Sequence, residues 1–93
     1  MTRFEIIANR SVQEEIAGSL EDAIDDFYYT VVPVVHGRGR RSRRLGTATW
    51  PEENFILVAY VEDSLSEKVR DVVAAVKERF PVEGIRIFEL RGT

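Results

Sequence analysis

Two kinds of apolar pattern follow one another along this chain, and their order is the strongest constraint on its fold. Segments rich in alternating, β-branched or aromatic apolar residues, which are typical of strands, lie at 3–9, 28–35, 55–61 and 85–90. Apolar residues at three- and four-residue spacing, which indicate an amphipathic helix, follow the first and the third of these segments. This order predicts an α+β, ferredoxin-like βαββαβ fold, in which two helices cover one face of a four-stranded antiparallel sheet.

Both predicted helices begin with the sequence pattern of a capping box. Ser11 with Glu14, and Ser64 with Glu67, have the spacing at which each side chain reaches a free backbone N–H group of the first turn. Pro81 ends the second helix, because proline has no N–H group to continue the hydrogen-bond pattern. Each helix has one apolar stripe for the core. The stripes consist of Val12, Ile16, Leu20, Ala23, Ile24 and Phe27, and of Leu65, Val69, Val72, Val73, Val76 and Phe80.

The strand at 55–61 is apolar on both of its alternating faces, which is typical of a strand that is covered on both sides. The two helices of this fold cover one side of the sheet only. We expect Ile7, Val58 and Tyr60 on the bare side. We therefore expect a second copy of the chain to cover that side and the protein to be a homo-oligomer.

Two further features concern the ends of the predicted strands. Pro33 lacks a backbone N–H group, which predicts an edge position or a bulge for its strand. Residues 91–93 follow the last strand as a short tail, which we expect to be frayed.

The stretch from His36 to Asn54 separates the second and third predicted strands and has too little apolar content to build a core. It holds five of the chain's 13 basic residues, its only His and its only Trp. With Glu52 and Glu53 its net charge is +3, whereas the remaining residues carry eight basic and 14 acidic side chains, for −6. A basic loop therefore stands on an acidic body. Surface loops on rigid scaffolds often carry function, so we expect the functional site here.

Length and composition limit the broad class of protein. Ninety-three residues fit a single domain, which we expect to span 1–93. No apolar run approaches the roughly 20 residues of a membrane span, and the N-terminus is too quickly interrupted by charge for a signal peptide. The absence of cysteine excludes disulfides and thiolate metal sites and is compatible with a reducing cytoplasm, where we expect the protein to be.

The arginines of the loop favour the binding of an anion. Guanidinium groups pair bidentately with phosphate and carboxylate groups, and neighbouring glycines let backbone N–H groups approach them. We predict a small anionic ligand or a protein partner; a solvated loop without a ligand is the alternative. Nucleic acid is a further alternative, although the acidic body repels a polyanion and no aromatic residue lies among the arginines. The predicted site consists of His36, Gly37, Arg38, Gly39, Arg40, Arg41, Arg43, Arg44, Gly46, Thr47, Thr49, Trp50 and Asn54.

Other chemistry has little support in the sequence. His36 with Glu52, Glu53 or Asn54 could ligate a metal ion, but no His-x-His or Cys spacing accompanies them, so we expect no metal site. Trp50 is interpreted as packing over the sheet edge, with a ligand-stacking platform as the alternative. No nucleophile–base pair or desolvated carboxylate pair is recognisable, so we expect a protein that is not an enzyme.

Two segments resemble the PII (GlnB-like) nitrogen-signalling proteins and their short PII-like relatives. Residues 30–40, TVVPVVHGRGR, are similar to the family's second-strand run that ends in G-x-G-R. Residues 46–54, GTATWPEEN, resemble the G-T-x-T-W-P segment of short PII-like proteins. The resemblance implies the βαββαβ order with a long T-loop, here 37–53, between the second and third strands.

The resemblance further implies a homotrimer, with adenine nucleotides in clefts between subunits at the base of the T-loop. Gly39 and Arg40 would match the family's phosphate-contacting pair. The chain departs from the family pattern in two places. After the second helix, residues 81–84 replace the family's Gly-Asp-Gly-Lys loop. The Tyr that is modified in regulated T-loops is absent, because no Tyr lies between 36 and 54. The sequence also ends at Thr93, so we expect the family's arginine-bearing tail to be missing. We therefore expect no cofactor, and a trimeric signalling protein that senses an effector or contacts a partner through its basic loop.

Overall fold

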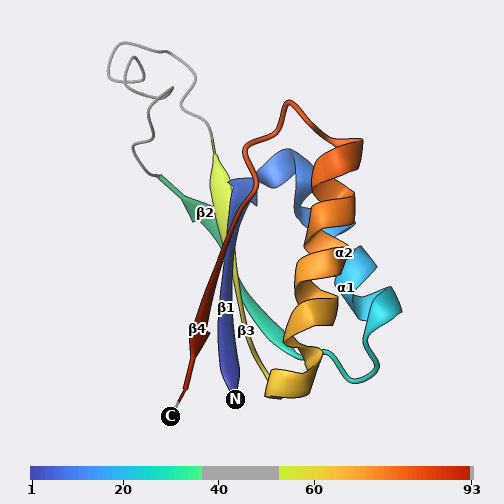
Figure 1. Cartoon of the computed structure of the whole chain (residues 1–93). Coiled ribbons are helices and arrows are strands. Elements are labelled where there is room, and N and C mark those ends of the chain that lie inside the picture. The colour runs from blue at the N-terminus through green and yellow to red at the C-terminus, as the bar shows by residue number, and fades with distance from the viewer. Residues whose placement is uncertain (37–52, 93) are drawn as a thin grey trace.

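A computed structural model describes residues 1–36 and 53–92 of the chain (Figure 1). The elements are β1 (Thr2–Asn9), η1 (Arg10–Val12), α1 (Gln13–Ala23), β2 (Tyr29–Val35), β3 (Asn54–Val61), η3 (Asp63–Leu65), α2 (Ser66–Arg79) and β4 (Arg86–Arg91), where η denotes a 3-10 helix. The four strands form one antiparallel sheet in the order β2-β3-β1-β4. The predicted ferredoxin-like α+β fold is therefore confirmed.

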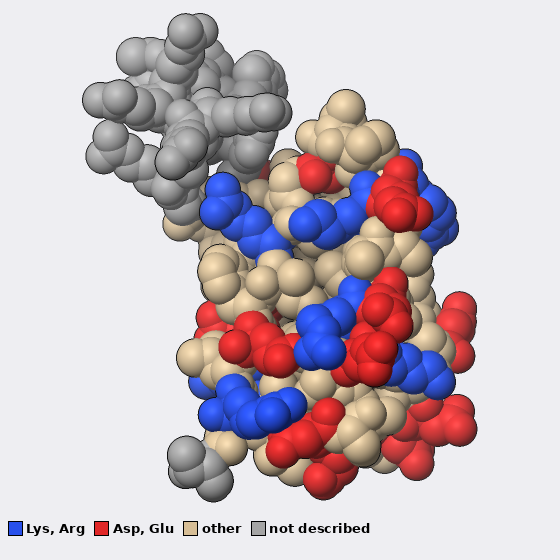
Figure 2. Space-filling view, viewed as in Figure 1, with Lys and Arg blue, Asp and Glu red and all other residues tan. Residues whose placement is uncertain are grey.

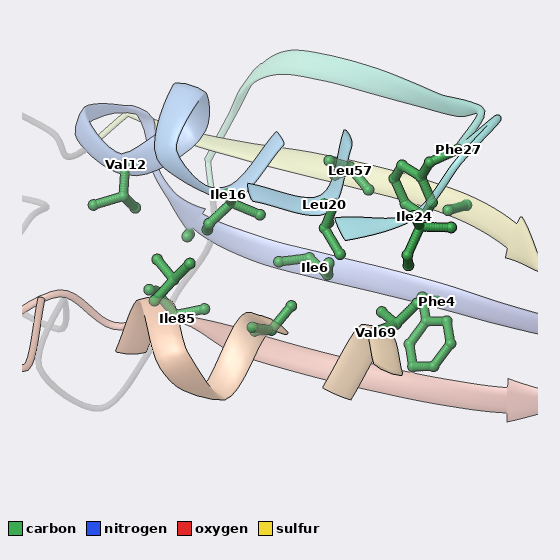
Figure 3. Close-up of a cluster of buried hydrophobic side chains, with 14 of the residues drawn as sticks. Phe4, Ile6, Val12, Ile16, Leu20, Ile24, Phe27, Leu57, Val69 and Ile85 are labelled. Carbon is green, nitrogen blue, oxygen red and sulfur yellow. The ribbon is translucent and has the colours of Figure 1, made fainter. Parts of the chain in front are cut away.

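The core lies between the sheet and the two helices, which pack side by side on one of its faces (Figure 1). Alternate residues of the inner strands, among them Ile6 and Leu57, are fully buried on that face. Ile16 and Leu20 extend from α1 toward Ile6 of β1 (Figure 3). Most positions of the two predicted helical stripes are confirmed as core. The buried ones are Val12, Ile16, Leu20, Ile24, Phe27, Val69, Val73 and Val76.

The opposite face of the sheet has no helix over it (Figure 1). Because Ile6 and Leu57 point to the core, their strand neighbours Ile7 and Val58 point to the open face, as does Tyr60. The predicted bare face is therefore confirmed for the part of the chain that the structure describes. On this face Tyr60 and Leu90 are well exposed, at 58% and 53%, whereas Ile7 and Val58 are partly buried.

The predicted capping boxes are wrong, although both helices begin close to the expected residues. A 3-10 turn precedes each α-helix, so Ser11 and Ser64 lie inside these turns and no side chain caps α1 or α2. The Asn9 side chain instead accepts a hydrogen bond of 2.9 Å from the backbone N–H of Ser11. Within the described ranges, no helix is long and apolar enough to cross a membrane.

The strand ends differ from expectation in one respect. Strand β2 lies at an edge of the sheet, and its pairing with β3 shifts around Pro33, between Val32 and Val35, as predicted. The expected frayed tail is wrong for two residues. Arg91 is part of β4, and the backbone N–H of Gly92 donates to the carbonyl oxygen of Met1 over 2.8 Å. The tail is held because β4 runs antiparallel to β1 up to the start of that strand.

We predict that Asp63 makes the stability of the fold depend on pH. The hydroxyl of Thr2 donates to its carboxylate over 2.6 Å and, together with the amino group of Met1, lowers the pKa of Asp63. Because the pKa is lower in the folded chain than in the unfolded one, this stabilisation is present above the unfolded pKa. It is lost as the pH falls through the folded pKa.

The replacement Asp63→Asn should therefore destabilise the protein at neutral pH and reduce its loss of stability in acid. Thermal unfolding midpoints measured from about pH 7 down to about pH 2 test this. Glu67→Gln, an exposed carboxylate on α2, is the matched control. Equal loss of stability in acid for Asp63→Asn and for the wild type would contradict the prediction.

Candidate functional site

The predicted site straddles the boundary of the described residues. His36 and Asn54 are described, whereas Gly37, Arg38, Gly39, Arg40, Arg41, Arg43, Arg44, Gly46, Thr47, Thr49 and Trp50 lie outside the described residues. The structure therefore describes only the residues on either side of the 37–52 segment. We call Val35 and His36, which precede the segment, its outgoing leg, and Glu53 and Asn54, which follow it, its returning leg.

The two legs leave the same end of the sheet. Val35, the last residue of β2, is paired with Asn54, the first residue of β3. His36 follows directly and is exposed, while Asn54 is partly buried and lies opposite Asn9 of β1. The chain termini lie at the other end of the sheet (Figure 1). The structure thus brings His36 and Asn54, the first and last residues of the predicted site, to the same end.

Arg10 holds the returning leg of this segment. Its backbone N–H donates to the carbonyl oxygen of Glu53 over 3.0 Å, and its guanidinium Nη1 lies 2.7 Å from the Glu53 carboxylate. Sequence reasoning missed Arg10 as a residue of the site. The signal was present, because Arg10 directly follows β1 and Glu53 directly precedes β3, and these strands are antiparallel neighbours.

The same corner of the molecule also contains the start of the first helix. Asn9, whose side chain holds the backbone N–H of Ser11, directly precedes Arg10. The backbone hydrogen bond and the ion pair therefore connect Glu53 to the turn between β1 and α1. A displacement of Glu53 would therefore break or shift its contacts with this turn. A ligand that binds the Arg10 guanidinium would have to displace the Glu53 carboxylate.

The described charges near this end are mixed rather than uniformly basic. Figure 2 shows both basic and acidic side chains at the end of the molecule next to the undescribed segment. Among the described residues, the two groups with shifted pKa values lie at the opposite end of the sheet. There the Thr2 hydroxyl lowers the pKa of Asp63, and the hydrogen bond to Glu21 raises the pKa of Tyr29.

Among the residues described, no three or more His, Cys, Asp or Glu side chains form a group suited to a metal ion.

The sheet order and the two helices define a ferredoxin-like α+β protein in which the 37–52 segment joins β2 to β3 at one end of the sheet. No family model matches the sequence, and no curated protein matches it. Solved structures do match, and the ones described below are PII-like proteins.

CPII, a nitrogen regulatory PII-like protein from Thiomonas intermedia K12 bound to ADP, AMP and bicarbonate, superposes with a TM-score of 0.65 at 16% identity. The match covers 99% of this chain and 91% of that one. The apo form of CPII gives a TM-score of 0.64 at 15% identity, with coverages of 96% and 87%.

A signalling protein of Thermus thermophilus, described as PII-like, gives a TM-score of 0.68 at 17% identity, with coverages of 96% and 83%. The resemblance to PII-like proteins is thereby confirmed at the level of the fold.

We predict that the Arg10–Glu53 ion pair stabilises the protein only weakly. Both side chains are about half exposed, at 49% and 50%, so water and salt screen their attraction. A double-mutant cycle with Arg10→Ala and Glu53→Ala should give a coupling of about 0.2–1 kcal/mol in the free energy of unfolding in urea.

The control cycle combines Arg10→Ala with Glu67→Ala, where Glu67 is exposed on α2. These residues share no contact, and their effects should add. A coupling near zero for Arg10 and Glu53 would show that the ion pair does not hold the returning leg.

Proposed function

We propose that this chain is a PII-like regulatory binding protein, acting as one domain, and not an enzyme. In this proposal a small anionic effector or a partner protein binds the basic 36–54 loop, and binding changes what the protein contacts. The observation that carries the proposal is the fold, since CPII and the Thermus thermophilus protein match over nearly the whole chain.

The geometry of the loop legs supports this reading. A ligand can regulate a protein only if it binds two states with different affinity. Two interactions with Arg10 connect Glu53 to the turn that starts α1. A change in the position of the loop would therefore change the position of this turn. We propose that effector binding acts through this connection.

The class of effector follows from charge. The loop carries five arginines, and guanidinium groups bind phosphate or carboxylate oxygens best. The ligands named for CPII, which are ADP, AMP and bicarbonate, are all anions. Because the family's Gly-Asp-Gly-Lys loop is missing here, we propose a small anion, with an adenine nucleotide as one candidate among several.

The open sheet face supports assembly. Exposed apolar side chains on β3 and β4, among them Tyr60, Phe88 and Leu90, lie on either side of Arg3 and Glu5 of β1, and a homotrimer would bury them. We propose a cytoplasmic homotrimer in which the three loops supply a denser basic surface than one chain alone.

We predict that the five loop arginines carry the binding of the anion. Isothermal titration with ADP, AMP and bicarbonate should give binding that weakens by more than about tenfold when all five become Ala, since each lost charge-assisted hydrogen bond costs about 1.5–3 kcal/mol. The arginines are Arg38, Arg40, Arg41, Arg43 and Arg44.

The matched control replaces the same five arginines by Lys, which keeps the charge and removes the planar fork. This variant should bind more weakly than the wild type and more tightly than the Ala variant. Unchanged heats in the Ala variant would refute an anion site in the loop. Binding of an oligonucleotide with a steep salt dependence would favour the nucleic-acid alternative instead.

We predict a particle of three chains in solution. Light scattering or sedimentation at neutral pH should give three times the 10.6 kDa mass of one chain. A monomer over the whole accessible concentration range would contradict the proposed assembly, whereas the titration with the arginine variants would still test the proposed loop site.

A further inference from the structure

The open sheet face carries one ion pair among apolar neighbours. Arg3 and Glu5 both lie on β1, two residues apart, and therefore point to the same face. The Nη2 atom of Arg3 lies 2.9 Å from Oε2 of Glu5. In the strand register Arg3 lies between an aromatic and an aliphatic residue, and so does Glu5. These neighbours are Tyr60 and Leu90 for Arg3, and Val58 and Phe88 for Glu5.

Arg3 makes three contacts, but one of its N–H groups has no hydrogen-bond partner. Besides the ion pair with Glu5, Nη1 donates to the Tyr60 hydroxyl over 3.0 Å, and Cζ lies 5.6 Å from the centre of the Tyr60 ring. The Nε–H group of Arg3 is buried and has no hydrogen-bond partner. A buried donor without a partner destabilises this arrangement, so an isolated chain does not offer Arg3 its best surroundings.

The pair also contributes little to the stability of a single chain. Both side chains remain partly exposed, at 42% for Arg3 and 32% for Glu5, and partly exposed ion pairs are weak. Desolvating the pair strengthens the attraction between opposite charges but makes any unpaired charge costly. The ion pair therefore has its largest effect on free energy when another surface covers the open face and removes water from it.

The charges also indicate what covers the surface. One Arg and one Glu on the same strand make the face complementary to itself, so that Arg3 of one copy can meet Glu5 of the next. In a cyclic assembly of three copies, three such contacts close a ring. We propose that Arg3 and Glu5 form an ion pair between neighbouring copies and that this pair determines the register in which the open faces associate. The inference rests on the homotrimer of the proposed function and adds the contact that specifies it.

The test uses two full-length charge-reversal variants, alone and mixed. Arg3→Glu gives a chain with two carboxylates at this place, and Glu5→Arg gives a chain with two guanidinium groups. Each variant alone should associate at least about tenfold more weakly than the wild type, because like charges meet at every contact. In an equimolar mixture at low salt, two of the three contacts of a mixed trimer join opposite charges. Native mass spectrometry should therefore detect particles that contain both chains.

Three controls accompany the mixture. The reciprocal double variant, R3E with E5R, should assemble as the wild type does, which shows that reversed charges are tolerated. Lys68→Glu and Glu14→Arg, exposed on α2 and α1, produce the same changes of net charge away from the sheet and should leave assembly unchanged. Circular dichroism checks that each variant is folded. Should a reversal variant fail to fold, Arg3→Met and Glu5→Gln replace it, and each should weaken association.

Two results would overturn the inference. One is normal assembly of both single variants. The other is an absence of mixed particles when the double variant assembles, because the pair would then act only within one chain. A monomeric wild type would overturn this inference and the proposed trimer together. It would leave the arginine-loop titration as an independent test of the anion site.

Discussion

The helices α1 and α2 bury one face of β1 and β3, and this burial determines both the core and the open sheet face. Successive residues of a strand point to opposite faces, so the register that buries Leu57 against the helices also places Ile56 and Val58 on the open face. A slip of one residue would exchange the two faces completely. The covered core and the open apolar surface are therefore two consequences of the same pairing.

The same pairing positions the candidate functional site. Antiparallel β1 and β3 bring the residue after one strand next to the residue before the other, which is why Arg10 contacts Glu53. Strand β2 ends beside the start of β3, so both legs of the 37–52 segment leave one end of the sheet. The Arg10–Glu53 ion pair next to the segment is half exposed, so solvent weakens its attraction.

Much of this arrangement could be predicted from the sequence, because the apolar residues of its strands and helices recur at regular spacing. The periods of two and 3.6 residues identified every strand and both α-helices of the described residues, and Pro33 indicated the irregular edge strand. The capping boxes failed for a physical reason. A 3-10 turn placed Ser11 and Ser64 before the α-helical backbone begins, and a side-chain pattern cannot reveal that extra turn.

Composition and local spacing showed which residues are apolar, at what intervals they recur, and that a basic segment separates two strands. Those properties are local, and they were sufficient for the fold class and for the bare sheet face. The contacts between distant residues are seen only in the folded chain, where Arg10 meets Glu53, Gly92 meets Met1 and Arg3 meets Tyr60. These contacts join residues that are far apart along the chain, separated by 43 positions for Arg10 and Glu53 and by 57 for Arg3 and Tyr60. They depend on which strands pair and in which register, and a local pattern gives the ends of a strand without its partner.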